Sequence, residues 1–204
     1  MEKKPTLRLI CRSLKFVAPY IQRELPDYEL IESGAGDAAV CLFTSEEADD
    51  LHAREELPAG CTTLICPNVV GTGMNGWPMT IAEAIARGRY FNIKGNEERL
   101  STVHASDVAV AVRLSLGHGG TFTVTDLNDP RQIDFAEAIA HRLNDKRIFT
   151  VSSTWAPWLM GRKLFNFVTE SDVYDGEEFA YQFKFKPTPV VEYLRTHVYD
   201  DESL

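Results

Sequence analysis

The chain has 204 residues, of which 44% are hydrophobic and 25% charged, a composition typical of one sizeable globular domain or of one domain with a small added lobe. Its formal net charge of −9 argues against non-specific binding to nucleic acid or to an anionic membrane. The acidic excess lies late, with nine acidic and three basic residues from Glu170 to Leu204, and we interpret it as a solvated surface.

The first residues carry charges where a signal peptide needs an apolar stretch, and no apolar run approaches the ~18 residues of a membrane helix. We therefore expect a cytoplasmic protein. The four cysteines, Cys11, Cys41, Cys61 and Cys66, form no close pair in sequence and share no metal-ligand spacing with a histidine. They are expected to be buried free thiols, with no metal site, and alternation along a strand places Cys61 and Cys66 on opposite faces.

Strand-like and helix-like segments alternate along the chain. Ser13 is placed to cap the first helix, and Asp134 and Glu137 have the spacing of a capping box. The pattern predicts a parallel sheet with helices on both faces. In chain order it indicates strand 6–11, helix 13–25, strands 28–32 and 38–43, an exposed helix or loop over 45–57, strand 61–66, helix 78–88, strand 90–93, helix 106–117, strand 121–126, helix 134–144, strand 147–151, and helices over 153–167 and 188–198.

A glycine-rich loop, "PNVVGTGMNG", follows the buried strand "CTTLIC". After it come "IAEAIARG", "RLSTVHASDVAVAV", "FTVTD" and "DFAEAIAHRL", in that order. Over roughly residues 60–195 the chain resembles the second half of the extended short-chain dehydrogenases/reductases, the family of NAD-dependent sugar-nucleotide epimerases and dehydratases. The resemblance implies a shortened Rossmann-like α/β core over 1–151, including a substrate loop at 66–76. A mostly helical C-terminal lobe over 152–204 would pack on it as one compact unit.

The resemblance also implies candidate ligand contacts. Asn68 and Gly71 match the family's strand-end stretch beside the sugar nucleotide, with Thr72 and Gly73 in the same loop, while Cys66 stands where the family has arginine. Arg99 is the nearest match to an arginine that holds a nucleotide phosphate, and His104 matches a family histidine. Each has a structural alternative: the loop residues can serve a tight turn, and His104 can satisfy backbone groups at the start of a helix.

The turn that binds the cofactor in this family is not recognisable. Glycines after the first strand normally let the backbone approach the dinucleotide pyrophosphate, but the turn here is "ICRSLKF" and the first glycine is Gly34. Glu32 stands near the position of the ribose-binding acid, as a weak remnant. We therefore expect no NAD(P) binding in the usual mode.

No catalytic residue is assigned either. The family needs a tyrosine and a lysine one helical turn apart, and the interval between Phe43 and Cys61 holds neither. Tyr90 and Lys94 have the spacing but lie in a strand-like segment, where they would be about 13 Å apart. Loss of the helices in that interval would also remove the usual dimer interface, so a homo-oligomer would need another surface, such as the aromatic segment 154–167.

Three functions remain open. The first is a catalytically inactive relative that binds a sugar nucleotide or regulates a partner protein. The second is an active epimerase, dehydratase or reductase with an unconventional NAD(P) site. The third is a protein that binds no small molecule and acts only through protein contacts.

Overall fold

The computed structural model describes residues 4–51 and 60–196. The expected helix or loop at 45–57 and the final helix therefore extend partly outside the described residues. The strands are β1 (Thr6–Cys11), β2 (Glu29–Ile31), β3 (Ala38–Phe43), β4 (Thr62–Ile65), β5 (Val69–Val70), β6 (Phe91–Ile93), β7 (Val103–His104), β8 (Gly120–Thr123) and β9 (Phe149–Val151). The helices are α1 (Ala18–Glu24), α2 (Ser45–Leu51), α3 (Gly76–Ala86), α4 (Ala105–Ser115), α5 (Gln132–Arg142), α6 (Ala156–Met160), α7 (Arg162–Val168), α8 (Glu177–Phe183) and α9 (Val190–Thr196), with a 3-10 turn at Lys15–Val17.

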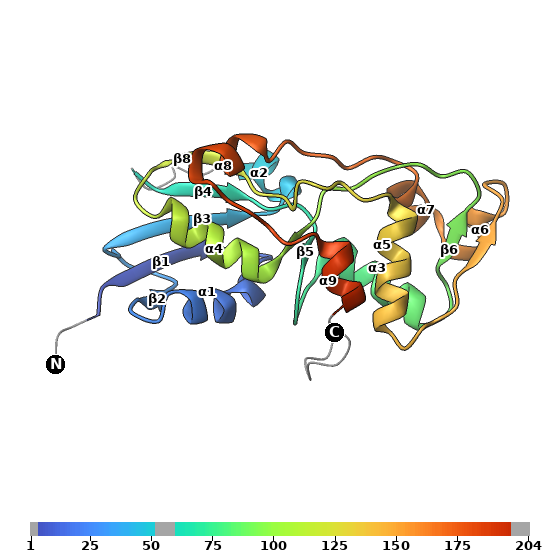
Figure 1. Cartoon of the computed structure of the whole chain (residues 1–204), viewed down its shortest axis with the longest axis horizontal. Helices are drawn as coiled ribbons and strands as arrows, with labels where there is room; N and C mark the ends of the chain where they lie inside the picture. Colours follow the sequence, from blue (N-terminus) through green and yellow to red (C-terminus); the bar gives the residue numbers. More distant parts are fainter. Residues whose placement is uncertain (1–3, 52–59, 197–204) are drawn as a thin grey trace.

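Five strands form a parallel sheet in the order β2-β1-β3-β4-β8, which confirms the expected α/β fold (Figure 1). The remaining strands in the described residues form two separate parallel pairs, β5 with β7 and β6 with β9. The expectation that alternating strands would join one sheet was therefore only partly right, because β6 and β9 pair outside it.

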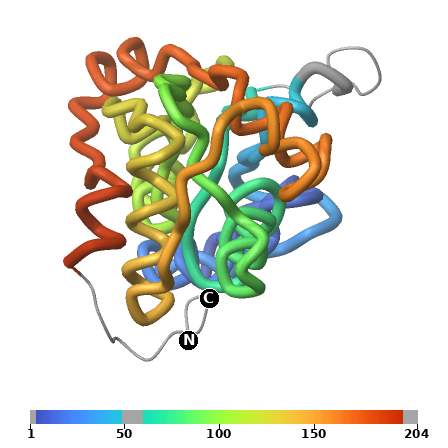
Figure 2. The backbone as a smooth tube through the Cα atoms, turned by 90° about the vertical axis from the view of Figure 1, so that its right-hand side faces the viewer, coloured from blue at the N-terminus to red at the C-terminus, as the bar shows by residue number. Residues whose placement is uncertain are grey.

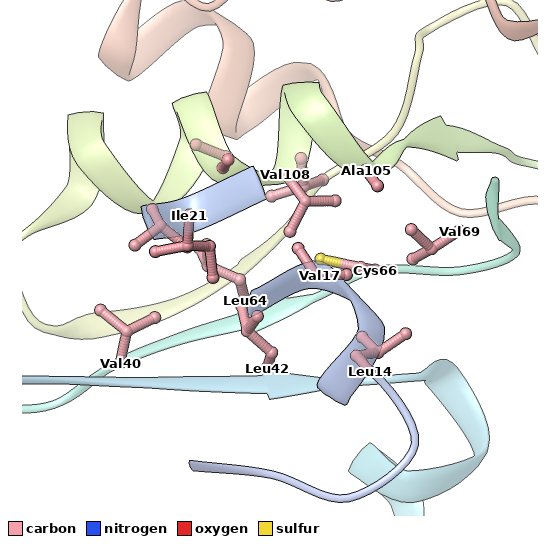
Figure 3. Packing of buried hydrophobic residues seen from close by; sticks show 14 of the residues in the cluster. Leu14, Val17, Ile21, Val40, Leu42, Leu64, Cys66, Val69, Ala105 and Val108 are labelled. Carbon is pink, nitrogen blue, oxygen red and sulfur yellow. The ribbon is translucent and has the colours of Figure 1, made fainter. Parts of the chain in front are cut away.

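One face of the sheet carries the larger part of its core. Alternation along the strands turns Leu9, Val40 and Leu64 to one side of the sheet, where they are at most 6% exposed. Helices α1 and α4 cover this side, and Figure 3 shows Val40 and Leu64 in the same cluster as Ile21 of α1 and Val108 of α4. The opposite face has a small cluster made of Cys41, Phe43, Ala48 and Cys61. Cys66 belongs to the large cluster under α1 and α4, and Cys61 to the small cluster on the opposite face, so the prediction that they point to opposite faces is confirmed.

A second hydrophobic cluster lies beyond the carboxyl ends of the sheet strands, on the right of Figure 1. It joins α3, α5, β6, α6, α7 and α9, and α9 runs beside α5 (Figure 2). It draws residues from both sides of residue 151, such as Phe135 and Leu194. Phe179 of α8, by contrast, packs with the sheet through Phe122, so the C-terminal part of the chain contributes to both clusters.

Two details of the predicted helices were wrong. Ser13 makes no cap for the first helix, which begins later with the 3-10 turn and α1. Asp134 and Glu137 form no capping box, because α5 begins at Gln132, Asp134 pairs with Arg131, and Glu137 accepts a hydrogen bond from Asn92. Among the described residues no helix is long and apolar enough to cross a membrane.

Candidate functional site

A cavity of about 890 Å³ opens at the carboxyl ends of β1 and β3, between the sheet and the second cluster. This edge of a parallel sheet is where ligands bind in open α/β folds. We call the cavity the cleft. Its walls come from the turn after β1, the end of β3, the residues after β4, α3, the α6–α7 junction and the segment 170–174: Ser13, Leu14, Thr44, Ser45, Glu46, Asn68, Val69, Asn75, Gly76, Trp77, Pro78, Thr80, Glu83, Ala84, Arg87, Arg89, Met160, Gly161, Arg162, Lys163, Leu164, Phe167, Glu170, Ser171, Asp172 and Tyr174.

Polar groups of the turn after β1 are bound by the chain itself. The Ser13 backbone N–H and hydroxyl donate to Glu47 Oε1 at 3.0 and 2.7 Å, and the Thr44 N–H donates to Glu47 Oε2 at 2.9 Å. The Asn75 side-chain amide donates to the Ser13 carbonyl. A carboxylate of the protein thus joins the ends of β1 and β3, next to the turn that holds a dinucleotide pyrophosphate in Rossmann folds.

Glu32 does not take part in this arrangement. Its carboxylate forms an exposed ion pair with Lys15 at 3.3 Å, with 80% of the Glu32 side chain accessible. An exposed pair of this kind contributes little to stability, and nothing in it orients Glu32 toward the cleft.

Asn68 is the one candidate from the glycine loop that lines the cleft. It has φ of 44°, and its side-chain amide donates to the Ser101 carbonyl at 3.0 Å and to Asp172 Oδ2 at 2.8 Å. The same Asp172 exchanges backbone hydrogen bonds with the neighbouring stretch, donating to the Arg99 carbonyl and accepting from Ser101 N–H. Asn68 thereby ties segment 170–174, one wall of the cleft, to the end of β4.

The other loop candidates lie outside the cleft lining. A Cβ on Gly71 would come within 2.8 Å of the Ala105 Cβ and 3.1 Å of the Tyr20 hydroxyl, so the packing there requires glycine. The Thr72 N–H donates to the Tyr20 hydroxyl at 2.9 Å, and Gly73 has φ of 77°. In this structure Gly71 and Thr72 dock the loop on α1 and α4.

Arg99 and His104 are also placed away from the cleft lining. The Arg99 guanidinium donates to the Asp129 carbonyl at 2.8 Å. His104 is 4% exposed, caps α4 by accepting the Ser106 N–H at Nδ1, and has its ring 4.0 Å from that of Tyr193. The structural alternative for His104 therefore has direct support.

The cleft contains aromatic and basic side chains that were not predicted from the sequence as ligand-binding residues. The rings of Trp77 and Phe167 stack at 3.9 Å with 13° between their planes, and the Lys163 ammonium lies 5.5 Å from the Trp77 ring centre. Arg89 and Arg162 are exposed at the lining, while Arg87 pairs with Glu83 at 3.0 Å. The rich aromatic content of 154–167 was a partial signal, but nothing near residue 77 indicated its partner 90 positions later.

Tyr90 lies in the second hydrophobic cluster and is 5% exposed. Burial, with a smaller contribution from Glu137, raises its pKa above the usual 10. A tyrosine in this state is a poor proton shuttle at neutral pH, which agrees with rejecting Tyr90 and Lys94 as a catalytic pair. Among the described residues, no group of three or more histidine, cysteine or acidic side chains could hold a metal ion.

No protein-family model and no curated protein matches the chain. Solved structures do resemble it at near-full coverage. The UDP-N-acetylglucosamine 4-epimerase of Bacillus cereus has a TM-score of 0.59 and 12% identity, over 94% of this chain and 98% of that one. The human epimerase family protein SDR39U1 with NADPH has a TM-score of 0.62 and 11% identity, over 93% and 98%.

A third structure, a GDP-L-fucose synthetase from Naegleria fowleri bound to NADP, has a TM-score of 0.60 and 9% identity, over 97% and 94% of the two chains. At these identities the likeness concerns the fold. The chain therefore has the Rossmann-like fold of the NAD(P)-dependent epimerases and dehydratases, with a five-stranded parallel sheet flanked by helices.

Proposed function

We propose that this protein is a non-catalytic binding module of the epimerase/dehydratase type, which holds a sugar nucleotide in the cleft. The observation that carries the proposal is the Glu47 carboxylate bound by Ser13 and Thr44. A dinucleotide diphosphate brought to this turn would meet a negative charge that already occupies the donors, which supports loss of the cofactor site. The cleft itself remains, with most of its lining residues away from this turn.

The chemistry of the cleft supports an anionic ligand with an apolar part. Arg89, Arg162 and Lys163 supply cationic groups that can pair with a diphosphate, and Trp77 and Phe167 supply an apolar wall. Similar folds are known in a UDP-N-acetylglucosamine 4-epimerase and a GDP-L-fucose synthetase, whose names contain nucleotide-linked sugars.

The chain has three tryptophans, of which Trp155 and Trp158 are 66% and 86% exposed. In the double variant Trp155→Phe/Trp158→Phe, Trp77 in the cleft is the remaining tryptophan. We expect UDP-, GDP- or dTDP-sugars to change its fluorescence saturably, with calorimetry giving the same dissociation constant. If neither fluorescence nor calorimetry detects binding of any of the three classes of sugar nucleotide, the sugar-nucleotide function is excluded.

Charge variants locate the site. Arg162→Ala/Lys163→Ala is expected to weaken binding at least tenfold, because both cations line the cleft. Lys186→Ala is the matched control, since Lys186 is exposed and lies outside the lining. Equal affinity in the two variants would place the ligand elsewhere.

The active-enzyme alternative is tested by titrating the chain with NADH and NADPH. We expect no saturable change in cofactor fluorescence. Binding in the micromolar range would overturn the non-catalytic proposal and favour an unconventional cofactor site.

A second proposal is a protein-contact surface on α6. Trp155, Trp158 and Leu159 expose 66%, 86% and 48% of their areas, and exposed aromatic clusters mark interaction sites. Light scattering across a concentration series tests self-association through this surface. The double variant Trp158→Ser/Leu159→Ser should reduce the mass, and the control Tyr181→Ser, at an exposed site on α8, should leave it unchanged.

A further inference from the structure

Two cysteines lie in direct contact on the face of the sheet opposite α1 and α4. Cys41 Sγ and Cys61 Sγ are 2.8 Å apart, and a disulfide needs about 2.05 Å, so the sulfurs must approach by about 0.8 Å. Cys41 lies within β3 and Cys61 directly precedes β4, its parallel neighbour. We propose that Cys41 and Cys61 are a peroxide-responsive thiol pair, oxidised to an intramolecular disulfide that links β3 to the start of β4.

The surroundings distinguish these two thiols from the other two. Cys66 belongs to the cluster on the opposite face and the half-buried Cys11 packs against it, so the sheet itself separates them from Cys41 and Cys61. Burial raises the pKa of both Cys11 and Cys66, which favours their protonated, less nucleophilic form.

Arg8 adds a positive charge on the same face. Arg8 pairs with Ala39 in the sheet register, and Ala39 lies two residues before Cys41, so the side chains share one face. In the described part of the chain, the buried Arg8 Nε finds no hydrogen-bond acceptor. A buried cationic donor in this position stabilises a thiolate that forms next to it.

The order of the reaction follows from exposure and from the thiol contact. Cys61 is 8% exposed and lies next to exposed Gly60, whereas Cys41 is fully buried. The contact between the two thiols, with a smaller contribution from Arg8, lowers the pKa of Cys61, while the same contact raises the pKa of Cys41. Cys61 is therefore the thiol that meets the oxidant as a thiolate.

The chemistry balances with hydrogen peroxide as the oxidant. The Cys61 thiolate attacks one peroxide oxygen, forming a sulfenic acid and releasing hydroxide. The Cys41 thiol then displaces the sulfenic hydroxyl, so the S–S bond forms, the S–O bond breaks and water leaves. The resulting bond links two residues that are 20 positions apart in the sequence. The segment between them contains Thr44 and Glu47, whose hydrogen bonds help to join the ends of β1 and β3.

Thiol counting on the intact chain tests the proposal without a variant. After peroxide treatment of the folded protein, followed by alkylation under denaturing conditions, we expect two of the four thiols to be protected. Peptide mapping should join Cys41 to Cys61, and dithiothreitol should restore all four thiols. The oxidised chain should also melt about 5 °C or more above the reduced one, because the cross-link restricts the unfolded state.

Single variants test the order of reaction. Cys41→Ser should leave a sulfenic acid on Cys61 that dimedone traps, and Cys61→Ser should give no dimedone adduct at Cys41. Cys11→Ser is the control that keeps the disulfide, and Cys41→Ala replaces Cys41→Ser if the hydroxyl prevents folding. The proposal would be overturned if all four thiols stay free after peroxide, if the disulfide includes Cys11, or if it joins two chains. None of these outcomes bears on sugar-nucleotide binding.

Discussion

Gly71 is required by its neighbours rather than by its own backbone angles. Its φ is not among the positive values, yet an added Cβ would lie 2.8 Å from the Ala105 Cβ and close to the Tyr20 hydroxyl. The Tyr20 hydroxyl in turn accepts the Thr72 N–H, so one glycine keeps the loop, α1 and α4 in contact.

Gly71→Ala is expected to cost about 1–3 kcal/mol of unfolding free energy, the usual penalty of overpacking. Ala105→Gly alone should cost about 1 kcal/mol, because glycine disfavours the helix. If the two Cβ atoms clash, the unfolding free energy lost in the double variant, measured by urea titration, will be smaller than the sum of the losses in the two single variants. Strict additivity would show that the clash is relieved in another way.

Glu47 is a second residue whose role depends on distant partners. Its carboxylate accepts three hydrogen bonds, from Ser13 and Thr44. Glu47→Gln keeps the shape but removes the charge and one acceptor, so we expect a loss of about 1–2 kcal/mol in chemical denaturation. Glu46→Gln is the control in the same helical turn, since Glu46 is exposed, and should change stability by less than about 0.5 kcal/mol. Equal effects would point to the helix dipole rather than to these hydrogen bonds.

Single residues could be predicted only where their role is local. Asn68, predicted to follow a buried strand at a ligand-binding edge, lines the cleft, and its contact with a ligand stays a prediction. The start of a helix explained the place of His104. Glu47 and Trp77 could not be found in this way. Their partners, Ser13 and Phe167, are brought to them by the sheet and by the α3–α7 packing, which leave no mark on the neighbouring sequence.

At the scale of elements, α8 is the helix that the sequence did not predict. Its first turn is acidic and had suggested solvated surface, but Phe179 is 1% exposed and contacts the rings of Phe122 and Phe183. Seven residues are too few for a helix to be stable alone, so tertiary packing decides that α8 forms.

Phe179→Ala should therefore cost about 3–5 kcal/mol of unfolding free energy, as for other buried phenylalanines. Tyr181→Ala on the same helix removes a side chain that is 91% exposed and should be near neutral. Differential scanning calorimetry on both variants makes the comparison. A small effect of Phe179→Ala would mean that α8 is not docked on the sheet in solution.

The alternation of strands and helices predicted the main sheet correctly, since β1 and β3 have the predicted bounds. It did not predict that β6 and β9 pair with each other outside the main sheet, because the pattern of a strand does not show which other strand it pairs with. It also did not separate α6 from α7, where Gly161 adopts φ of 87° within the predicted helical segment.

At the scale of the whole molecule, the large cluster under α1 and α4 and the second cluster are held together partly by buried carboxyl groups. Asp107 Oδ2 accepts the Thr188 N–H at 2.9 Å, and Asp126 Oδ2 accepts the Val190 N–H at 2.8 Å. Thr188 and Val190 lie where the chain passes from α8, on the sheet, to α9, in the second cluster. Burial raises the pKa of both carboxyls above the ordinary value of 3.8.

These shifts predict how stability depends on pH. A carboxyl whose pKa is raised by folding binds its proton more tightly in the folded state, so its contribution to stability grows as the pH falls through the folded pKa toward 3.8. The difference in unfolding free energy between wild type and Asp126→Asn, from urea titrations at several pH values, should therefore rise on acidification.

Asp134 provides the opposite control, because the Arg131 side chain lowers its pKa. Its contribution is present above 3.8 and is lost as the pH falls through the folded pKa, so the wild type minus Asp134→Asn difference should fall in acid. If both differences are flat, neither carboxyl titrates differently in the folded and unfolded states.

The wall formed by segment 170–174 is fixed before any ligand arrives. Asp172 is bound through its backbone to Arg99 and Ser101 and through its side chain to Asn68, and the Tyr174 N–H donates to the Ser101 hydroxyl. A preorganised wall needs no rearrangement during association, so the binding of a ligand in the cleft should be a single step. In stopped-flow experiments the observed rate constant would then increase linearly with ligand concentration, without the plateau that an isomerisation imposes.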